Sequence, residues 1–269
     1  MPDCFNYGHS TNLIGVATAY LASAVFNQQP MPLHIAGTRE SASGLFDCLA
    51  RQSDRHECGR IFQAYMCDVF GFDAEQQLRN DKYGRRRYRN SYLHLIQDWG
   101  LDSNNAQGAV FKGWVESRFG LYPTYHKQPL LKFNSRQWAG YIEEKMNSRY
   151  HNNCIYMQLD LLYEFCQWMV ARFQLPAIDY MRLYRGVNSL DEHSIVEKID
   201  KQHKIIRFNN INSFTDRRSI ASEFGAYILE VQVPVVKLVF FTELLPHHAL
   251  RGENEYLVLG GDYQVKVYR

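Results

Sequence analysis

Near the C-terminus, two glutamates precede an apolar run in the stretch Arg251-Gly252-Glu253-Asn254-Glu255-Tyr256-Leu257-Val258-Leu259-Gly260-Gly261. The run from Tyr256 to Leu259 has the composition of a β-strand. Alternate side chains of a strand lie on one face, so Glu253 and Glu255 are expected to point in the same direction. Two carboxylates that lie so close repel each other. A Glu-x-Glu pattern by itself therefore indicates an exposed acidic turn before a strand. Two further stretches favour a different interpretation.

The first, Leu183-Tyr184-Arg185-Gly186-Val187, places an arginine in an apolar, strand-like context. The second, Asn212-Ser213-Phe214-Thr215-Asp216, places two small hydroxyl side chains at the end of a strand-like run. The order arginine, Ser-x-Thr, Glu-x-Glu resembles the R-S-E class of arginine-specific mono-ADP-ribosyltransferases. Within that class the chain resembles the dinitrogenase reductase ADP-ribosyltransferases, which switch off nitrogenase in nitrogen-fixing bacteria. Motifs spread over nearly the whole chain carry this resemblance: His9-Ser10-Thr11-Asn12-Leu13, Ile35-Ala36-Gly37-Thr38-Arg39-Glu40, Lys112-Gly113-Trp114-Val115-Glu116-Ser117-Arg118-Phe119-Gly120, Gln158-Leu159-Asp160-Leu161-Leu162-Tyr163-Glu164-Phe165-Cys166-Gln167-Trp168 and Leu244-Leu245-Pro246.

The resemblance implies a reaction that breaks the bond between nicotinamide and ribose in NAD. Positive charge then develops at the anomeric carbon, and a fixed carboxylate beside it stabilises the transition state. By resemblance this carboxylate is Glu255, which also holds the ribose 2′-hydroxyl. The acceptor arginine is a poor nucleophile while it is charged, and Glu253 is expected to orient its guanidinium and help take its proton. NAD is thus expected as a substrate, and no metal is predicted because no histidine or cysteine cluster has zinc spacing.

Five further side chains complete the site that the resemblance implies. Arg185 is expected to bind a phosphate of NAD through its planar fork of donors, and Gly186 to let the backbone approach the nicotinamide amide. Ser213 is expected to hydrogen-bond and orient the catalytic carboxylate. Thr215 either supports the same strand end or starts the helix that follows. Phe224 either stacks on nicotinamide or is a core aromatic residue.

Length, composition and charge indicate a globular protein. The 269 residues suffice for one large domain or two small ones, and a hydrophobic content of 46% supports a packed core. A net charge of +2 gives little reason to expect a nucleic-acid partner. Six cysteines without a C-x-x-C pair indicate thiols in a reducing cytosol.

The apolar segment from Thr11 to Phe26 is interpreted as a buried helix. No lysine or arginine precedes Arg39, so the segment lacks the positive region of a signal peptide. It is also shorter than the about 20 apolar residues that span a bilayer. The expected protein is therefore soluble and cytoplasmic, without a membrane span.

The hydrophobic period changes near Pro176 and divides the chain into two parts. Residues 1–175 are predicted to be mainly helical, and the longest apolar stripe runs at helical spacing from Ile155 to Phe173. Residues 176–269 are predicted to be the β-rich, NAD-binding catalytic part. No Gly/Ser linker separates the parts, so they are expected to share one core. The predicted fold class is α+β, with the helical N-terminal part packed on a C-terminal split β-sandwich of the ADP-ribosyltransferase type, as the resemblance implies.

Two local predictions concern the β-rich part. The stretch Gly260-Gly261-Asp262 is predicted to be the turn of a hairpin that joins a strand over 256–259 to a strand over 263–268. The stretch from Ile195 to Ile199 is predicted to be a short helix.

Two segments are candidates for contacts with other proteins. The run from Arg79 to Arg89 is rich in lysine and arginine. It is either a solvated loop and helix start, or a surface for an anionic partner or a phosphate group. The family is regulated by a P-II nitrogen-regulatory signalling protein, and the helical part, including the run from Arg85 to Arg89, is a candidate docking surface for it. The loop from Leu244 to Gly252 precedes the two glutamates and is expected to meet the target protein. Its His247 and His248 are interpreted as solvated loop residues, because no Ser-His-Asp or metal set accompanies them.

Three functions are compatible with this sequence. The leading hypothesis is a transferase that moves ADP-ribose from NAD to one arginine of dinitrogenase reductase. The alternatives are an NAD glycohydrolase, in which water is the acceptor, and a non-catalytic nucleotide-sensing adaptor for a regulatory partner. The intact R-S-E set argues against the adaptor. No G-x-G-x-x-G after a strand and no P-loop occur, so the common nucleotide-binding motifs are not supported.

Overall fold

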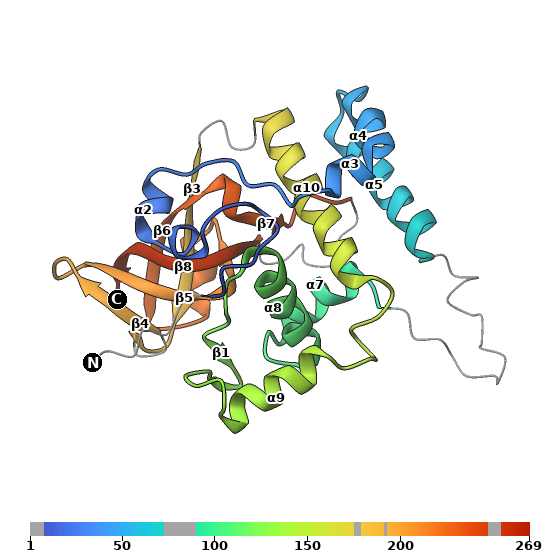
Figure 1. Cartoon of the computed structure of the whole chain (residues 1–269). Helices are drawn as coiled ribbons and strands as arrows, with labels where there is room; N and C mark the ends of the chain where they lie inside the picture. Colours follow the sequence, from blue (N-terminus) through green and yellow to red (C-terminus); the bar gives the residue numbers. More distant parts are fainter. Residues whose placement is uncertain (1–7, 73–89, 175–178, 191–192, 247–253) are drawn as a thin grey trace.

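The computed structural model describes residues 8–72, 90–174, 179–190, 193–246 and 254–269. Most of its helices precede the strands of the large sheet in the sequence (Figure 1). The helices are α1 (Thr18–Leu21), α2 (Ala24–Gln28), α3 (Thr38–Ser41), α4 (Ser43–Ala50), α5 (Arg55–Phe70), α7 (Tyr92–Leu101), α8 (Ala106–Phe119), α9 (Arg136–Lys145), α10 (Ile155–Phe173), α11 (Arg218–Glu223) and the 3-10 helix η2 (Val235–Lys237). The strands are β1 (Tyr125–His126), β2 (Gln128–Pro129), β3 (Tyr180–Val187), β4 (Ser194–Lys198), β5 (His203–Thr215), β6 (Tyr227–Pro234), β7 (Leu238–Phe241) and β8 (Glu255–Tyr268). Helices together with an antiparallel sheet confirm the predicted α+β class.

Six strands form one antiparallel sheet in the order β4-β5-β3-β6-β8-β7, and β5 also pairs with β8. Four of these strands close a ring, because β3 and β8 each pair with both β5 and β6. The length of β8 makes the ring possible: its residues 255–266 pair with β5, and its residues 265–268 pair with β6. The ring places the end of β5 directly beside the start of β8.

The segment from Glu255 to Tyr268 is one continuous strand, so the predicted hairpin at Gly260-Gly261-Asp262 is wrong. The two glycines permit close backbone contacts instead of a turn. A Cβ atom on Gly260 would lie 1.6 Å from the carbonyl oxygen of Asn209, and one on Gly261, where φ is 115°, would lie 2.6 Å from the carbonyl oxygen of Ala22. The paired glycines therefore mark the place where other backbone packs against β8.

The short helix predicted from Ile195 to Ile199 is also wrong, because this stretch contains strand β4. It pairs with β5 from Ser194 opposite Arg207 to Lys198 opposite Lys204, with a bulge between Ile195 and Glu197. Hydrogen bonds to a long neighbouring strand decide the conformation of this segment, and the bulge hides the alternation that a strand normally shows.

The N-terminal apolar segment is broken into two short helices, whereas one helix was predicted. Gly15 has a φ of 66°, which favours a turn, and Ser23 caps α2 by accepting a hydrogen bond of 3.2 Å from the amide of Phe26. The segment is nevertheless part of the core, since Leu21 and Phe26 are fully buried. Among the described residues, no helix combines the length and the apolar character that crossing a bilayer requires.

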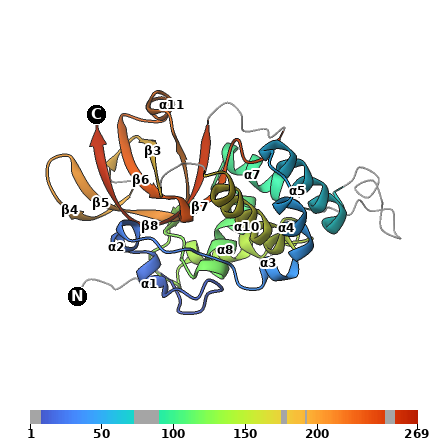
Figure 2. The same cartoon turned by 90° about the horizontal axis from the view of Figure 1, so that it is seen from above.

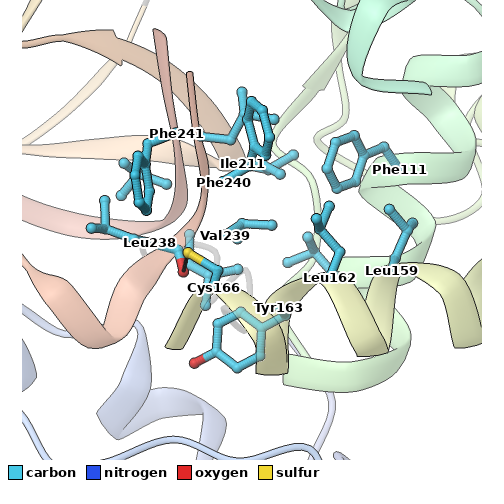
Figure 3. Close-up of a cluster of buried hydrophobic side chains, with 14 of the residues drawn as sticks. Phe111, Leu159, Leu162, Tyr163, Cys166, Ile211, Leu238, Val239, Phe240 and Phe241 are labelled. Carbon is cyan, nitrogen blue, oxygen red and sulfur yellow. Dashed lines mark hydrogen bonds between the residues drawn. The ribbon is translucent and has the colours of Figure 1, made fainter. Parts of the chain in front are cut away.

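Helix α10 lies between the sheet and the helices of the N-terminal part (Figures 1 and 2). Its apolar residues face β7 in a shared cluster of buried side chains (Figure 3). Two polar contacts fix the helix on η2 and β7: the Tyr163 hydroxyl donates to the carbonyl of Val236 at 2.8 Å, and the Gln167 amide donates to the carbonyl of Leu238 at 2.7 Å. One hydrophobic cluster contains residues of both parts. The division between residues 175 and 176 stays a prediction.

Candidate active site

A cavity of about 400 Å³ lies between the sheet and the end of α7. Its walls come from β3, the end of β5, the start of β8, α11 and residues 99–103. The cavity is of the size of small-molecule sites in proteins. Six residues that the sequence predicted for the site line it: Arg185, Gly186, Ser213, Thr215, Phe224 and Glu255. Residues about 70 positions apart in the chain are thus brought to one place by the ring of strands.

Glu255 is a buried carboxylate that is held by its neighbours. It is 4% exposed, and the Ser213 hydroxyl donates to its Oε1 at 2.5 Å. The register of β5 and β8 explains this contact, because Glu255 lies opposite Thr215 and Ser213 is two residues earlier on the same face. The backbone amide of Glu255 donates to the Thr242 hydroxyl at 2.8 Å. Both the side chain and the backbone of the glutamate are therefore positioned.

Arg185 is anchored to the end of β5, the strand that carries Ser213. It lies on β3, whose Tyr184 pairs with Thr215 of β5. Its guanidinium donates through Nη1 to the backbone carbonyl of Ser213 at 2.7 Å. The arginine is half-buried and lines the cavity, so its charge faces the space beside Glu255.

Gly186 is required by the fold. A Cβ atom at this position would lie 2.0 Å from the carbonyl oxygen of Ala221, so only glycine lets β3 and α11 approach each other this closely. Because Gly186 also lines the cavity, its bare backbone is accessible from the same space.

Thr215 and Phe224 each had two interpretations. The hydroxyl of Thr215 accepts a hydrogen bond of 3.2 Å from the amide of Arg217, just before α11. This contact agrees with its interpretation as a helix-start residue, although Thr215 also lines the cavity. Phe224 is 54% exposed, so its interpretation as a core aromatic residue is wrong. Its ring lies at the cavity instead.

Glu253, the second glutamate of the Glu-x-Glu motif, lies outside the described residues. The same is true of His247 and His248 and of the basic run from Arg79 to Arg89. Their predicted roles stay predictions.

Trp99 is a site residue that sequence reasoning missed. It comes from α7, in the helical part, and its indole Nε1 donates to the Ser213 hydroxyl at 2.8 Å. The residues that follow it, Gly100 to Ser103, form a wall of the cavity. Tyr92, Leu95, Ile96 and Trp99 recur at helical spacing, and this pattern alone explains Trp99 as a core residue. Only the contact with β5, which is distant in sequence, reveals its second role.

The positive charge near the cavity comes from Arg185 and not from the neighbouring histidine. Burial, together with the charge of Arg185, lowers the pKa of His193 to about 3. The imidazole is therefore neutral at physiological pH and packs against Phe208, with ring centroids 5.0 Å apart. In the described part of the chain, no group of three or more His, Cys, Asp or Glu side chains could hold a metal ion.

These features define what the cavity can do chemically. A buried carboxylate fixed by a hydroxyl can stabilise a developing positive charge. A guanidinium on the adjacent strand can bind a phosphate group. The arrangement of Arg185, Ser213 and Glu255 around one space is the one that the R-S-E class of NAD-dependent ADP-ribosyltransferases leads us to expect.

Comparison with known proteins identifies the family. The family model described as dinitrogenase reductase ADP-ribosyltransferase (DRAT) matches residues 11–267, and the chain belongs to this family. A relative from Rhodospirillum rubrum, the NAD(+)--dinitrogen-reductase ADP-D-ribosyltransferase, is 54% identical over 261 residues, which are 96% of this chain and 95% of the relative. No solved structure matches the chain. The resemblance that the sequence motifs indicated is confirmed.

Proposed function

We propose that this protein transfers ADP-ribose from NAD to an arginine of dinitrogenase reductase, and thereby inactivates nitrogenase. The observation that carries the proposal is Glu255, a carboxylate that is 4% exposed, accepts a hydrogen bond of 2.5 Å from Ser213 and shares a cavity with Arg185. The name of the R. rubrum relative supports it, since it gives NAD and dinitrogen reductase as the reactants of an ADP-ribosyltransferase.

NAD binds in the cavity of about 400 Å³ in this proposal. Arg185, whose guanidinium presents five N–H groups in a planar fork, binds the diphosphate. The nicotinamide lies beside the backbone of Gly186 and stacks on Phe224, whose ring is exposed at the cavity. Thr215 supports the strand end that carries Ser213.

The reaction breaks the bond between the ribose anomeric carbon and the nicotinamide nitrogen. The bonding electrons stay with the ring, so the leaving group is neutral nicotinamide, and the sugar becomes oxocarbenium-like. Glu255 stabilises this cation and holds the ribose 2′-hydroxyl. A nitrogen of the acceptor arginine then bonds to the anomeric carbon and loses one proton, which Glu253 accepts.

The pairing pattern of the sheet supports assigning it to the split β-sandwich of ADP-ribosyltransferases. The ring of β3, β5, β8 and β6, with β4 and β7 each paired to one strand of the ring, folds one sheet back on itself, and the cavity is lined by β3, β5 and β8 of this ring. In this assignment the catalytic residues lie where the two halves of the sandwich separate.

Two further assignments rest on the family. The protein acts in the cytoplasm, and a P-II nitrogen-regulatory signalling protein controls it by docking on the helical part that includes the run from Arg85 to Arg89. Charge reversal at Arg85, Arg86 and Arg87 is expected to weaken P-II binding. Unchanged binding would remove this docking surface.

Mass spectrometry tests the proposed function. Purified dinitrogenase reductase is incubated with NAD and with wild-type protein, the Glu255→Gln variant or the Glu230→Gln variant. Glu230 lies on β6, outside the cavity lining, and bonds the Tyr268 hydroxyl at 3.1 Å. We expect one added ADP-ribose on an arginine with wild type and Glu230→Gln, and none with Glu255→Gln. Equal modification by Glu255→Gln, or modification of another residue type, would overturn the proposal.

A further inference from the structure

Trp99, Ser213 and Glu255 form a chain of hydrogen bonds whose direction is fixed. The indole Nε1 of Trp99 lies 2.8 Å from Ser213 Oγ, which lies 2.5 Å from Glu255 Oε1. An indole nitrogen can only donate, whereas a hydroxyl has one hydrogen and two lone pairs. Ser213 must therefore accept from Trp99, and its single hydrogen is directed at the carboxylate.

Trp99 is held rigidly in the helical part. It is 4% exposed, and its ring meets Phe111 edge to face with centroids 5.5 Å apart. The ammonium of Lys112 lies 5.8 Å from the centroid of the same ring. A side chain packed on several sides cannot change rotamer without disturbing the core, so the indole N–H keeps its position.

The backbone that follows Trp99 is fixed as well. Lys112 donates to the side-chain oxygen of Asn104 at 3.0 Å. A Cβ atom on Gly108 would lie 2.2 Å from the carbonyl oxygen of Ser103, so the loop after α7 lies directly on α8. The loop wall of the cavity and the indole N–H therefore form one rigid unit.

We propose that Trp99 is a positioning residue for catalysis: its N–H holds the Ser213 hydroxyl as a donor to Glu255. This proposal rests on the proposed function, because it assigns a role within the same reaction. Without the indole N–H, the Ser213 hydroxyl can rotate, and the carboxylate loses part of its orientation. The helical part then contributes directly to the rate of the chemical step.

The test replaces the indole N–H and keeps an aromatic ring. In Trp99→Phe we expect kcat for nicotinamide release to fall about tenfold, the effect of one lost hydrogen bond, while KM for NAD changes less than about threefold. Trp114→Phe is the matched control, since Trp114 is a buried tryptophan of α8 whose Nε1 donates to Asp160 at 2.7 Å. It is expected to leave kcat unchanged. Incorporation of benzothienylalanine at position 99, which has sulfur in place of the N–H, covers the case in which phenylalanine disturbs folding.

A double-mutant cycle separates positioning from packing. If Trp99 acts through Ser213, adding Trp99→Phe to Ser213→Ala causes no further loss of kcat. If the fold decrease in kcat of the double variant equals the product of the two single decreases, the proposal is overturned. It is also overturned if both position-99 variants have the kcat of wild type. Failure of the proposed function has a different signature, because the wild-type protein itself would then transfer no ADP-ribose to dinitrogenase reductase.

Discussion

Replacing Lys237 by methionine is expected to stabilise the protein at neutral pH. Lys237 is fully buried, and its ammonium lies 5.1 Å from the ring centroid of Phe26 and 4.8 Å from that of Tyr263. Its Nζ donates to the carbonyl of Gly260 at 3.3 Å. Burial lowers the pKa of this lysine from 10.5 to about 7, so the folded state disfavours its charge.

The size of the effect follows from that pKa. A difference of 10.5 − 7 = 3.5 pKa units corresponds to about 5 kcal/mol of destabilisation at or below neutral pH. Methionine has a similar length and no charge, but it forfeits one hydrogen bond of about 1 kcal/mol and two cation–π contacts of about 1 kcal/mol each. The expected net gain in the free energy of unfolding is therefore about 2 kcal/mol.

The gain in the free energy of unfolding that Lys237→Met brings must depend on pH in a defined direction. Between pH 7 and 10.5, unfolded chains hold the proton of Lys237, whereas folded chains have largely lost it. The contribution of Lys237 to the free energy of unfolding therefore rises with pH through this window. The destabilisation by Lys237 is complete below pH 7 and absent above 10.5. Burial also lowers the pKa of Lys112 to about 7, but Lys112 is present in both proteins, so its titration cancels in the comparison.

Denaturant unfolding of wild type and Lys237→Met at about pH 7 and about pH 10 tests this expectation. Lys198→Met, which replaces an exposed lysine of β4, is the control and is expected to change stability little at either pH. The advantage of Lys237→Met is expected to disappear at the higher pH. The reasoning is refuted if Lys237→Met is less stable than wild type at neutral pH, or if its advantage in the free energy of unfolding is the same at both pH values.

Three more outcomes are expected. Arg185→Lys removes the planar fork of donors and should raise KM for NAD about tenfold or more with little change in kcat. An unchanged KM for NAD would contradict the assignment of Arg185 as a phosphate-binding residue. Glu253→Gln should abolish transfer to arginine yet spare some NAD hydrolysis, and equal loss of both activities would contradict the division of roles between the glutamates. Gly260→Ala should lower the free energy of unfolding by about 3 kcal/mol, because the added methyl group clashes with the backbone of Asn209. The control is Gly44→Ala, at a helical position with nothing within 4 Å, which should raise the free energy of unfolding by up to about 1 kcal/mol. Equal changes in both variants would show that the close contact at Gly260 is unimportant.

The residues with the strongest chemical signature were predictable from the sequence. Arg185, Ser213 and Glu255 occur in short motifs whose order along the chain is informative, and the structure brings them to one cavity. Each is a polar residue in an apolar, strand-like context, where its presence needs an explanation beyond packing.

The wrong hairpin, the wrong helix and the missed role of Trp99 have one physical cause, because long-range contacts decided between two locally possible interpretations. Paired glycines fit a tight turn as well as a close backbone contact, and only the position of Asn209 beside Gly260 selects the second. Pairing with β5 makes β4 a strand. Trp99 fits a helical apolar stripe, so its hydrogen bond to Ser213 carried no local signal.

The central claim is that NAD binds in the cavity of about 400 Å³, with its nicotinamide ribose at Glu255. The most direct test is a crystal structure of the Glu255→Gln protein with NAD, since this variant is expected to bind the dinucleotide without consuming it. We predict that the anomeric carbon lies beside residue 255 and that the diphosphate lies against Arg185. NAD bound elsewhere, with this cavity empty, would contradict the account.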